Sequence, residues 1–444
     1  MNWRKPIIYS LLYLSGSKIP SILKEIKKID KFSFIEKQRY QEEKLKKILL
    51  HVYNNVPYYH KILADAKIVD SNQEINLENF HKIPILTKEI IRREGENLYS
   101  KDYKKRKSYE NTSGGSTGEP VGFLQDKNYD EWNKANKIYY KTFGNQDIGD
   151  KELRLWGSER DILEGKEKFS LRLKNWLYNR KELNAFRMSE KDMERFVIEW
   201  NKFKPQWIEA YAQSIYEFAK FIKARKLSIY SPRGVLTSAG TLYPEMEEVL
   251  REVFHYPVFN RYGSREVGSV ACSDGNKKEL KLSIWNNYVE ILNNQLISCR
   301  AEEMGKIYIT TLNNYSMPLI RYDIGDVGVK GNDWEYLEKV EGREMNVFKT
   351  KDGKLIPGEF FIHFIGVVFN RGFISKFQVI QKDFDYILIK TIIRDKIKLE
   401  ENRMAIEESI RKIMGEDCKI QWEFVNEIPP LKSGKYVYTI SEIR

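Results

Sequence analysis

The sequence is poor in cysteine and histidine, and this limits the chemistry that it can carry out. Its 444 residues include three cysteines and five histidines. The cysteines (Cys272, Cys299 and Cys418) are odd in number and far apart, which indicates a reducing compartment and argues against a disulfide framework. Cys272 has no cysteine or histidine nearby in the sequence, so we expect no zinc bound to cysteine. None of the histidines stands in a triad-like or metal-like arrangement.

The N-terminal apolar run, Ile7 to Leu14, is too short to span a bilayer, and no clean cleavage site of a signal peptide follows it. We expect a short amphipathic helix docked on the protein. Loose attachment to the inner membrane surface is the alternative, because basic residues flank this apolar run. Together with the cysteine content, these features predict a cytoplasmic protein.

The charge balance is basic, with 75 Lys and Arg against 63 Asp and Glu, a net charge of +12. Such a balance is compatible with nucleic acid, a membrane surface or small anionic substrates. No nucleic-acid-binding motif accompanies the scattered lysines, so we expect no nucleic-acid partner. A solvated, lysine-rich surface explains most of the excess.

The pattern of apolar residues predicts an α/β protein. The length allows two or three domains, and the 41% hydrophobic content allows a sizeable core. Strand–helix–strand spacing between residues 234 and 262 predicts a parallel α/β unit, in which ligands bind at the carboxyl ends of the strands. The chain becomes β-rich after Gly305 and ends in a small α+β unit. Helices are expected at 35–65 (ended by Pro57), 192–203, 216–226, 244–254 and 400–414, and strands at 234–240, 257–262, 307–311, 318–322, 376–381, 386–391 and 420–425.

The most informative stretch is 112–120, Thr-Ser-Gly-Gly-Ser-Thr-Gly-Glu-Pro. Its three glycines and four hydroxyl side chains leave the backbone N–H groups open to a phosphate. It is not a Walker loop, because no Gly-Lys-Ser/Thr follows. A flexible surface turn is the alternative interpretation of this stretch alone.

Four further motifs follow the loop in a fixed order. They are Asn-Arg-Tyr-Gly-Ser-Arg-Glu at 260–266, Ile-Arg-Tyr-Asp-Ile-Gly-Asp at 320–326, Glu-Gly-Arg at 341–343 and Pro-Pro-Leu-Lys-Ser-Gly-Lys at 429–435. The series resembles the adenylate-forming superfamily of acyl-CoA synthetases and peptide-synthetase adenylation domains. More narrowly, segments 50–59, 83–88 and 234–268 resemble the phenylacetate–CoA ligase branch and its CapK-like relatives in surface-polysaccharide biosynthesis.

The resemblance implies a fold and a division of the chain. It implies a large N-terminal domain at 1–341 with mixed α/β sheets and a β-rich part, which binds the nucleotide and the acid. A hinge at 342–346 would connect it to a small, mobile α+β domain at 347–444 that carries a catalytic lysine.

The resemblance also implies an activity. The protein would use ATP and Mg²⁺ to activate a carboxylic acid as acyl-AMP and then transfer the acyl group to a thiol or an amine, such as CoA, a sugar or an amino acid. Capsule or lipopolysaccharide synthesis is the favoured context, and an aryl acid–CoA ligase is the alternative. A non-catalytic nucleotide-binding scaffold is a further alternative, and the protein would be a monomer or a homodimer.

The motifs assign roles to individual residues. Lys435 would stabilise the α-phosphate and the attacking carboxylate, Thr117 would act with it, and Glu266 would hold Mg²⁺. Tyr262 would stack on adenine, and Asp326 would accept hydrogen bonds from the ribose hydroxyls. The full set of nucleotide contacts comprises Ser113, Gly114, Gly115, Ser116, Thr117, Gly118, Gly240, Tyr262, Gly263, Ser264, Asp326 and Arg343.

The acid would contact Trp156, Tyr211, Ser238 and Ala239, although these could equally be core residues. Two positions depart from the pattern of the relatives. Glu119 stands where many have lysine, and we expect its side chain to face solvent. Met345 stands where the hinge usually carries Asp or Lys, which makes the use of CoA less certain than adenylation.

Overall fold

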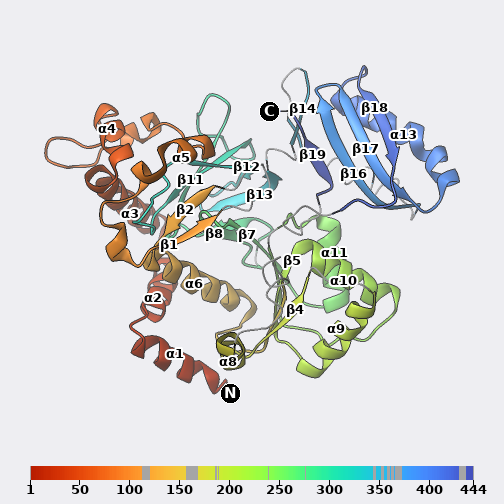
Figure 1. The fold of residues 1–444 in the computed structure, drawn as a ribbon, viewed down its shortest axis with the longest axis horizontal. Helices are drawn as coiled ribbons and strands as arrows, with labels where there is room; N and C mark the ends of the chain where they lie inside the picture. The colour runs from red at the N-terminus through yellow and green to blue at the C-terminus, as the bar shows by residue number, and fades with distance from the viewer. Residues whose placement is uncertain are drawn as a thin grey trace. The chain divides into compact units, whose positions relative to one another are not determined.

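We describe the fold from a computed structural model (Figure 1). The structure describes residues 2–112, 121–156, 169–185, 188, 190–238, 240–275, 277–343, 347–351, 355–357, 361, 365, 373–429 and 437–443. The chain forms two compact units, one of residues 1–324 and 330–339 and one of residues 325–329 and 340–444. The division therefore runs through two strands, β12 (Tyr322–Lys330) and β13 (Tyr336–Arg343).

The first unit begins with helices. Ser33 and Glu36 form a capping box that starts α3, the longest of them. The helix expected at 35–65 is in fact two helices, because Val56 is extended and Pro57 takes the first position of α4 instead of ending the helical region. These segments are α1 (Arg4–Leu14), α2 (Ile19–Ile29), α3 (Phe34–Asn55), α4 (Pro57–Asp65), η1 (Leu77–Lys82), α5 (Lys88–Glu94), η2 (Gly95–Leu98) and η3 (Tyr103–Arg106).

Polar contacts anchor α1 to the first unit. The Asn2 amide donates to the Ile148 carbonyl at 2.9 Å and to Asp150 at 2.8 Å, and Lys5 pairs with Asp147 at 2.7 Å. Of the residues in α1, Ile8 is buried. No helix in the described part of the chain is both long and apolar enough to cross a membrane.

A hairpin of β1 (Tyr109–Thr112) and β2 (Gly122–Gln125) encloses the Gly/Ser-rich loop, and α6 (Lys127–Lys141) and η4 (Thr142–Gly144) follow it. The main sheet comes next, in the order β10-β11-β12-β13-β9-β8-β7-β6-β5-β3-β4. Its strands besides β12 and β13 are β3 (Glu152–Trp156), β4 (Arg180–Asn184), β5 (Trp207–Tyr211), β6 (Val235–Ser238), β7 (Val258–Ser264), β8 (Gly268–Cys272), β9 (Leu280–Leu282), β10 (Asn287–Leu292) and β11 (Met304–Thr311).

The part of the sheet from β4 to β7 is parallel, as the strand–helix–strand spacing predicts. Its connections include α8 (Phe169–Leu177), α9 (Glu190–Phe203), α10 (Ala212–Ala224) and α11 (Pro244–Phe254). The helices α9, α10 and α11 lie together beside these strands (Figure 1). They bury an apolar core against one sheet face, which includes Leu153, Leu155, Trp200, Phe218 and Phe254.

The prediction of a strand at 318–322 is wrong, because β12 begins only at Tyr322. Arg321 has a φ of 50°, outside the extended region. Its buried guanidinium pairs with Glu290 at 3.0 Å and donates to the carbonyl oxygens of His81 and Ile83. These long-range contacts turn the backbone before the strand begins.

The second unit is a small α+β structure, in agreement with the expected fold class. A four-stranded sheet has the order β18-β17-β16-β19, and α13 lies beside it (Figure 1). Its core includes Phe377, Ile389, Leu399, Ile406 and Ile410. The elements are β14 (Val347–Lys349), β15 (Leu355–Pro357), β16 (Ile374–Asp383), β17 (Tyr386–Ile393), α13 (Lys396–Met414), β18 (Lys419–Phe424) and β19 (Thr439–Ser441).

Candidate active site

Three of the four residues expected to contact the acid lie at the carboxyl ends of neighbouring parallel strands. Trp156 ends β3, Tyr211 ends β5 and Ser238 ends β6, and Tyr211 is in register with Ser238. The Trp156 and Tyr211 rings are in contact, with centroids 4.1 Å apart and planes inclined by 35°. Ligands of open parallel sheets bind at this edge. Ala239 lies outside the described residues.

The turn between β7 and β8 carries four of the expected nucleotide- and metal-binding residues. Tyr262, Gly263 and Ser264 end β7, and Glu266 lies in the turn itself. A Cβ atom on Gly263 would lie 2.2 Å from the Gly268 carbonyl oxygen, so the close approach of the two strands requires glycine here. The turn is therefore fixed by packing between backbones.

Two side chains hold this turn, one from β2 of the hairpin that flanks the Gly/Ser-rich stretch and one from α6. The Gln125 amide donates to the Arg265 carbonyl at 2.7 Å, and the Tyr129 hydroxyl donates to the carbonyls of Arg265 and Glu266 at 3.4 and 3.3 Å. Gln125 ends β2, which pairs with β1 up to the contact of Thr112 with Gly122. Both ends of the loop are thus tied to the element that carries Glu266.

Glu266 is the one expected metal ligand, and its surroundings suit a cation. Glu266 as a whole is only 6% exposed, yet its carboxylate makes no hydrogen bond or ion pair with a described residue. The nearby Ser264 hydroxyl is also buried and has no partner among the described residues. Burying a charge without a partner is costly, so a bound cation would offset this cost.

A buried charged network lies under the carboxyl ends of the strands. Glu209 on β5 pairs with Arg154 at 2.6 Å and Arg261 at 2.7 Å, and Arg261 also donates to the Ser238 hydroxyl at 3.3 Å. Burial alone would raise the pKa of Glu209, but the two guanidinium groups outweigh it and hold that pKa well below its ordinary value. This network links the four neighbouring strands β3, β5, β6 and β7 and holds Ser238 at the end of β6.

Two of the expected nucleotide-binding residues, Asp326 and Arg343, belong to the second unit. Asp326 lies in β12, within the second unit, and is partly exposed, and Arg343 ends β13. Gly240 follows β6 and is exposed. The side chain of Arg343 is not described. Ser113, Gly114, Gly115, Ser116, Thr117, Gly118, Glu119, Met345 and Lys435 lie outside the described residues.

Sequence reasoning missed the residues that hold the site in place. Gln125 and Tyr129 lie 141 and 137 positions before Glu266, and nothing in their local sequence marks them. Glu209 was missed for the same reason. A polar residue within an otherwise apolar buried strand, as in Trp-Ile-Glu-Ala-Tyr, is the one signal that could have indicated it.

We expect Gln125→Ala to loosen the turn that carries Glu266. The Arg265 carbonyl would lose its shorter hydrogen bond, which should lower the free energy of unfolding by about 1 kcal/mol. Tyr129→Phe removes only the longer bonds and should cost less. Urea denaturation of both variants measures whether Gln125→Ala lowers the free energy of unfolding more than Tyr129→Phe does. Equal stability of wild type and Gln125→Ala would show that the amide does not support the turn.

Comparisons with known proteins confirm the expected resemblance. Residues 348–442 match the family model of the CapK C-terminal domain. The chain is 23% identical over 443 residues to Protein CapK of Staphylococcus aureus, covering 95% of this chain and 92% of that protein.

Among solved structures, 2-hydroxyisobutyryl-CoA ligase in the postadenylation state has a TM-score of 0.70 at 14% identity, covering 93% of this chain and 90% of that one. The amide bond synthetase McbA from Marinactinospora thermotolerans has a TM-score of 0.51 at 13% identity, covering 71% and 65%. The chain therefore has the fold of adenylate-forming ligases.

Proposed function

We propose that the protein is an adenylate-forming ligase. A carboxylate oxygen of the substrate attacks the α-phosphorus of ATP, pyrophosphate leaves, and the acyl-AMP then passes its acyl group to a nucleophile, which releases AMP. The observation that carries this proposal is the hydrogen bond by which Gln125, at the end of the strand that follows the Gly/Ser-rich stretch, holds the turn of Glu266. A phosphate-binding loop and a metal-binding carboxylate must lie close together to act on one nucleotide.

The chemistry brings two anions together, so charge neutralisation and positioning provide most of the catalysis. Backbone N–H groups of 113–118 and the hydroxyls of Ser113, Ser116 and Thr117 would hold the phosphates. Tyr262 would stack on adenine and Asp326 would bind the ribose. Lys435 would place a positive charge between the α-phosphate and the attacking carboxylate.

Mg²⁺ fits the residues of the turn. Glu266 would hold it, since its buried carboxylate has no described partner, and Mg²⁺ typically takes one or two carboxylates together with phosphate oxygens. When bound, the ion would neutralise charge on the phosphates.

The acid would bind where β3, β5 and β6 end. The paired rings of Trp156 and Tyr211 would form one wall, and Ser238, held by Arg261, would supply a hydroxyl. An aromatic wall is also what an aryl acid would need, and this keeps the aryl acid–CoA ligase as the second candidate.

The acceptor is an amine or a thiol. The similarity to CapK of Staphylococcus aureus supports a role in capsule or lipopolysaccharide synthesis, and so an amine on a sugar or amino acid. CoA remains the alternative acceptor. We place the reaction in the cytoplasm, with loose membrane attachment through α1 as the alternative, and the protein acts as a monomer or a homodimer.

A screen of acid-dependent ATP–pyrophosphate exchange tests the proposal. Aryl acids, fatty acids, amino acids and uronic acids would each be supplied with MgATP and labelled pyrophosphate. At least one acid should produce labelled ATP at a rate that depends on its concentration. Nucleotide binding without exchange for any class would favour the non-catalytic scaffold.

A further inference from the structure

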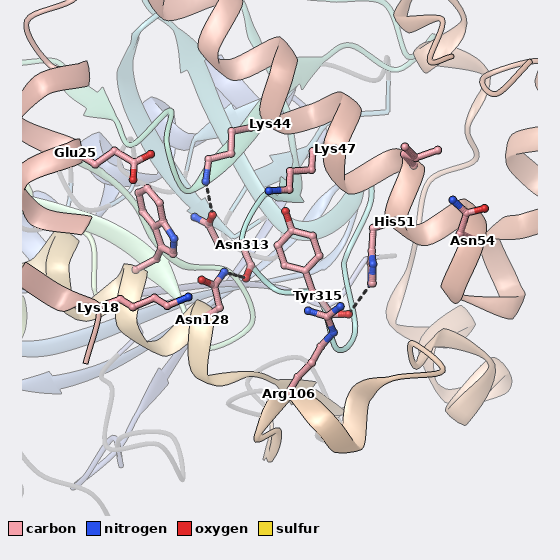
Figure 2. Close-up of a pocket in the computed structure, with 12 residues that line it drawn as sticks. Lys18, Glu25, Lys44, Lys47, His51, Asn54, Arg106, Asn128, Asn313 and Tyr315 are labelled. Atoms are coloured by element: carbon pink, nitrogen blue, oxygen red, sulfur yellow. Dashed lines mark hydrogen bonds between the residues drawn. The ribbon is translucent and has the colours of Figure 1, made fainter. Parts of the chain in front are cut away.

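A pocket separate from the residues discussed above lies in the first unit (Figure 2). Its volume is about 770 Å³, within the range typical of small-molecule sites. Its walls come from α2, α3, η3, the start of α6 and the segment after β11. The lining residues that matter here are Lys18, Glu25, Lys44, Lys47, Asn128 and Asn313.

The lining of the pocket has an excess of positive charge. Lys18, Lys44, Lys47 and Arg106 face one carboxylate, that of Glu25. Arg106 is already paired with Asp102, but no carboxylate among the described residues lies within ion-pair distance of the three lysines. Figure 2 shows Lys44 and Lys47 on the same helix, α3, and Lys18 and Arg106 on other segments around the same space. Three unpaired ammonium groups around one cavity favour an anionic ligand.

Lys44 is built into the wall and is not a mobile surface lysine. Its ammonium donates to the Asn313 side-chain oxygen at 2.8 Å and lies 4.1 Å from the centroid of the Trp132 ring. Asn313 is itself fixed, because its amide donates to the Trp285 carbonyl at 2.9 Å. Burial lowers the pKa of Lys44 to about 8. Glu25 forms no ion pair with Lys44, and its negative charge only partly offsets the effect of burial, so this site disfavours the charged ammonium.

The uncharged part of the lining combines apolar surface, as from Leu50 and Trp132, with the polar groups of three asparagines. The Asn313 amide is already engaged, since its nitrogen donates to Trp285 and Asn286 and its oxygen accepts from Lys44. The side-chain oxygens of Asn54 and Asn128 accept no hydrogen bond from a described residue, although their nitrogens donate to Gln73 and Asn313. Asn128 donates to the Asn313 carbonyl at 2.8 Å, and this bond links α6 to the segment after β11. A free amide oxygen suits a hydroxyl group, which can donate to it. The ligand is thus expected to carry hydroxyls as well as negative charge.

We propose that this pocket binds a phosphorylated saccharide, with the lysines holding the phosphates and the asparagine amides holding the hydroxyls. Phosphate suits the site better than a single carboxylate, because it offers more charge and three acceptor oxygens to several cations on different walls. This proposal does not depend on adenylate formation, because it rests on the pocket alone.

Calorimetric titration of the full chain with glucose 1,6-bisphosphate tests the proposal, with glucuronate and maltose as the carboxylate and neutral probes. Binding should be tightest for the bisphosphate and absent for maltose. Lys47→Ala, and Lys44→Met, which keeps an apolar stem, should each weaken it about tenfold or more. Lys46→Ala, an exposed lysine on the same helix outside the pocket, should bind like wild type.

Three outcomes would overturn the proposal. They are no heat of binding for the bisphosphate, tighter binding of glucuronate, or unchanged affinity in both pocket variants while the thermal melting temperature shows that they are folded. The last outcome would mean that the sugar phosphate binds elsewhere on this basic protein.

The pH dependence of binding provides an independent prediction. The groups that face Lys44 are Glu25, Lys18, Lys47, Arg106, His51 and Tyr40. Lys44 is charged below its pKa of about 8, so affinity should be high at pH 7 and fall as the pH rises from 8 to 9. His51 should not titrate between pH 8 and 9, since burial lowers its pKa from the ordinary value of 6.5. In Lys44→Met, most of this decline in affinity should disappear. An equal decline in the variant would show that Lys44 is not the group that titrates.

Discussion

Replacing Glu266 with glutamine should reduce MgATP-dependent adenylation by about 10²-fold, because a neutral amide cannot neutralise the metal that the carboxylate would hold. The variant should also require more Mg²⁺. Glutamine keeps the size of the side chain, so the turn between β7 and β8 should keep its bonds to Gln125 and Tyr129.

Stability distinguishes this role from a structural one. Glu266 is only 6% exposed as a residue and its carboxylate has no described partner, so removing the charge should leave the free energy of unfolding unchanged or increase it. Glu248→Gln, an exposed position on α11, serves as the matched control. A variant with lower stability and unchanged Mg²⁺ dependence would show that Glu266 is a structural acid.

Lys435→Ala should reduce formation of acyl-AMP by about 10²-fold or more, since it removes a positive charge from the reacting groups. The prediction rests on the sequence Ser-Gly-Lys at 433–435, whose lysine the resemblance assigns to catalysis and whose ammonium group is a flexible point charge. Lys432→Ala, three residues earlier in the same segment, is the matched control and should retain most activity.

The two half-reactions can be separated in the same variant. Acyl transfer from synthetic acyl-AMP bypasses the attack on the α-phosphorus, so Lys435→Ala should impair it much less than adenylation. Single-turnover measurements of each step provide the comparison. Near-normal pyrophosphate exchange in Lys435→Ala would remove this lysine from the mechanism, whatever the acceptor.

Local sequence predicted those elements whose signals are local. The helix at 244–254 begins with a proline at its first position and has an amphipathic pattern, and both signals act within a few residues. The parallel strands β6 and β7 were predicted because a short apolar run stands on each side of this helical segment. Local sequence did not predict the strands that end at Trp156 and Tyr211, and these two residues were expected near the acid only from the resemblance.

Predictions failed where distant residues determine the backbone. The apolar run at 318–322 looks like a strand, but the buried pair of Arg321 and Glu290 turns it aside. Gln125 and Lys44 act through partners more than 100 positions away. Neither periodicity nor a sequence motif indicates such long-range contacts. The residues that hold the candidate site in place, and the basic pocket, could therefore be identified only from the structure.

Transfer of a carboxylate oxygen to AMP tests the central proposal most directly. With an acid identified by the exchange screen and labelled with ¹⁸O in its carboxylate, attack on the α-phosphorus leaves one labelled oxygen on AMP after acyl transfer. We expect the label in AMP, with pyrophosphate as the other product. Label in inorganic phosphate with formation of ADP, or AMP without label, would contradict adenylate formation.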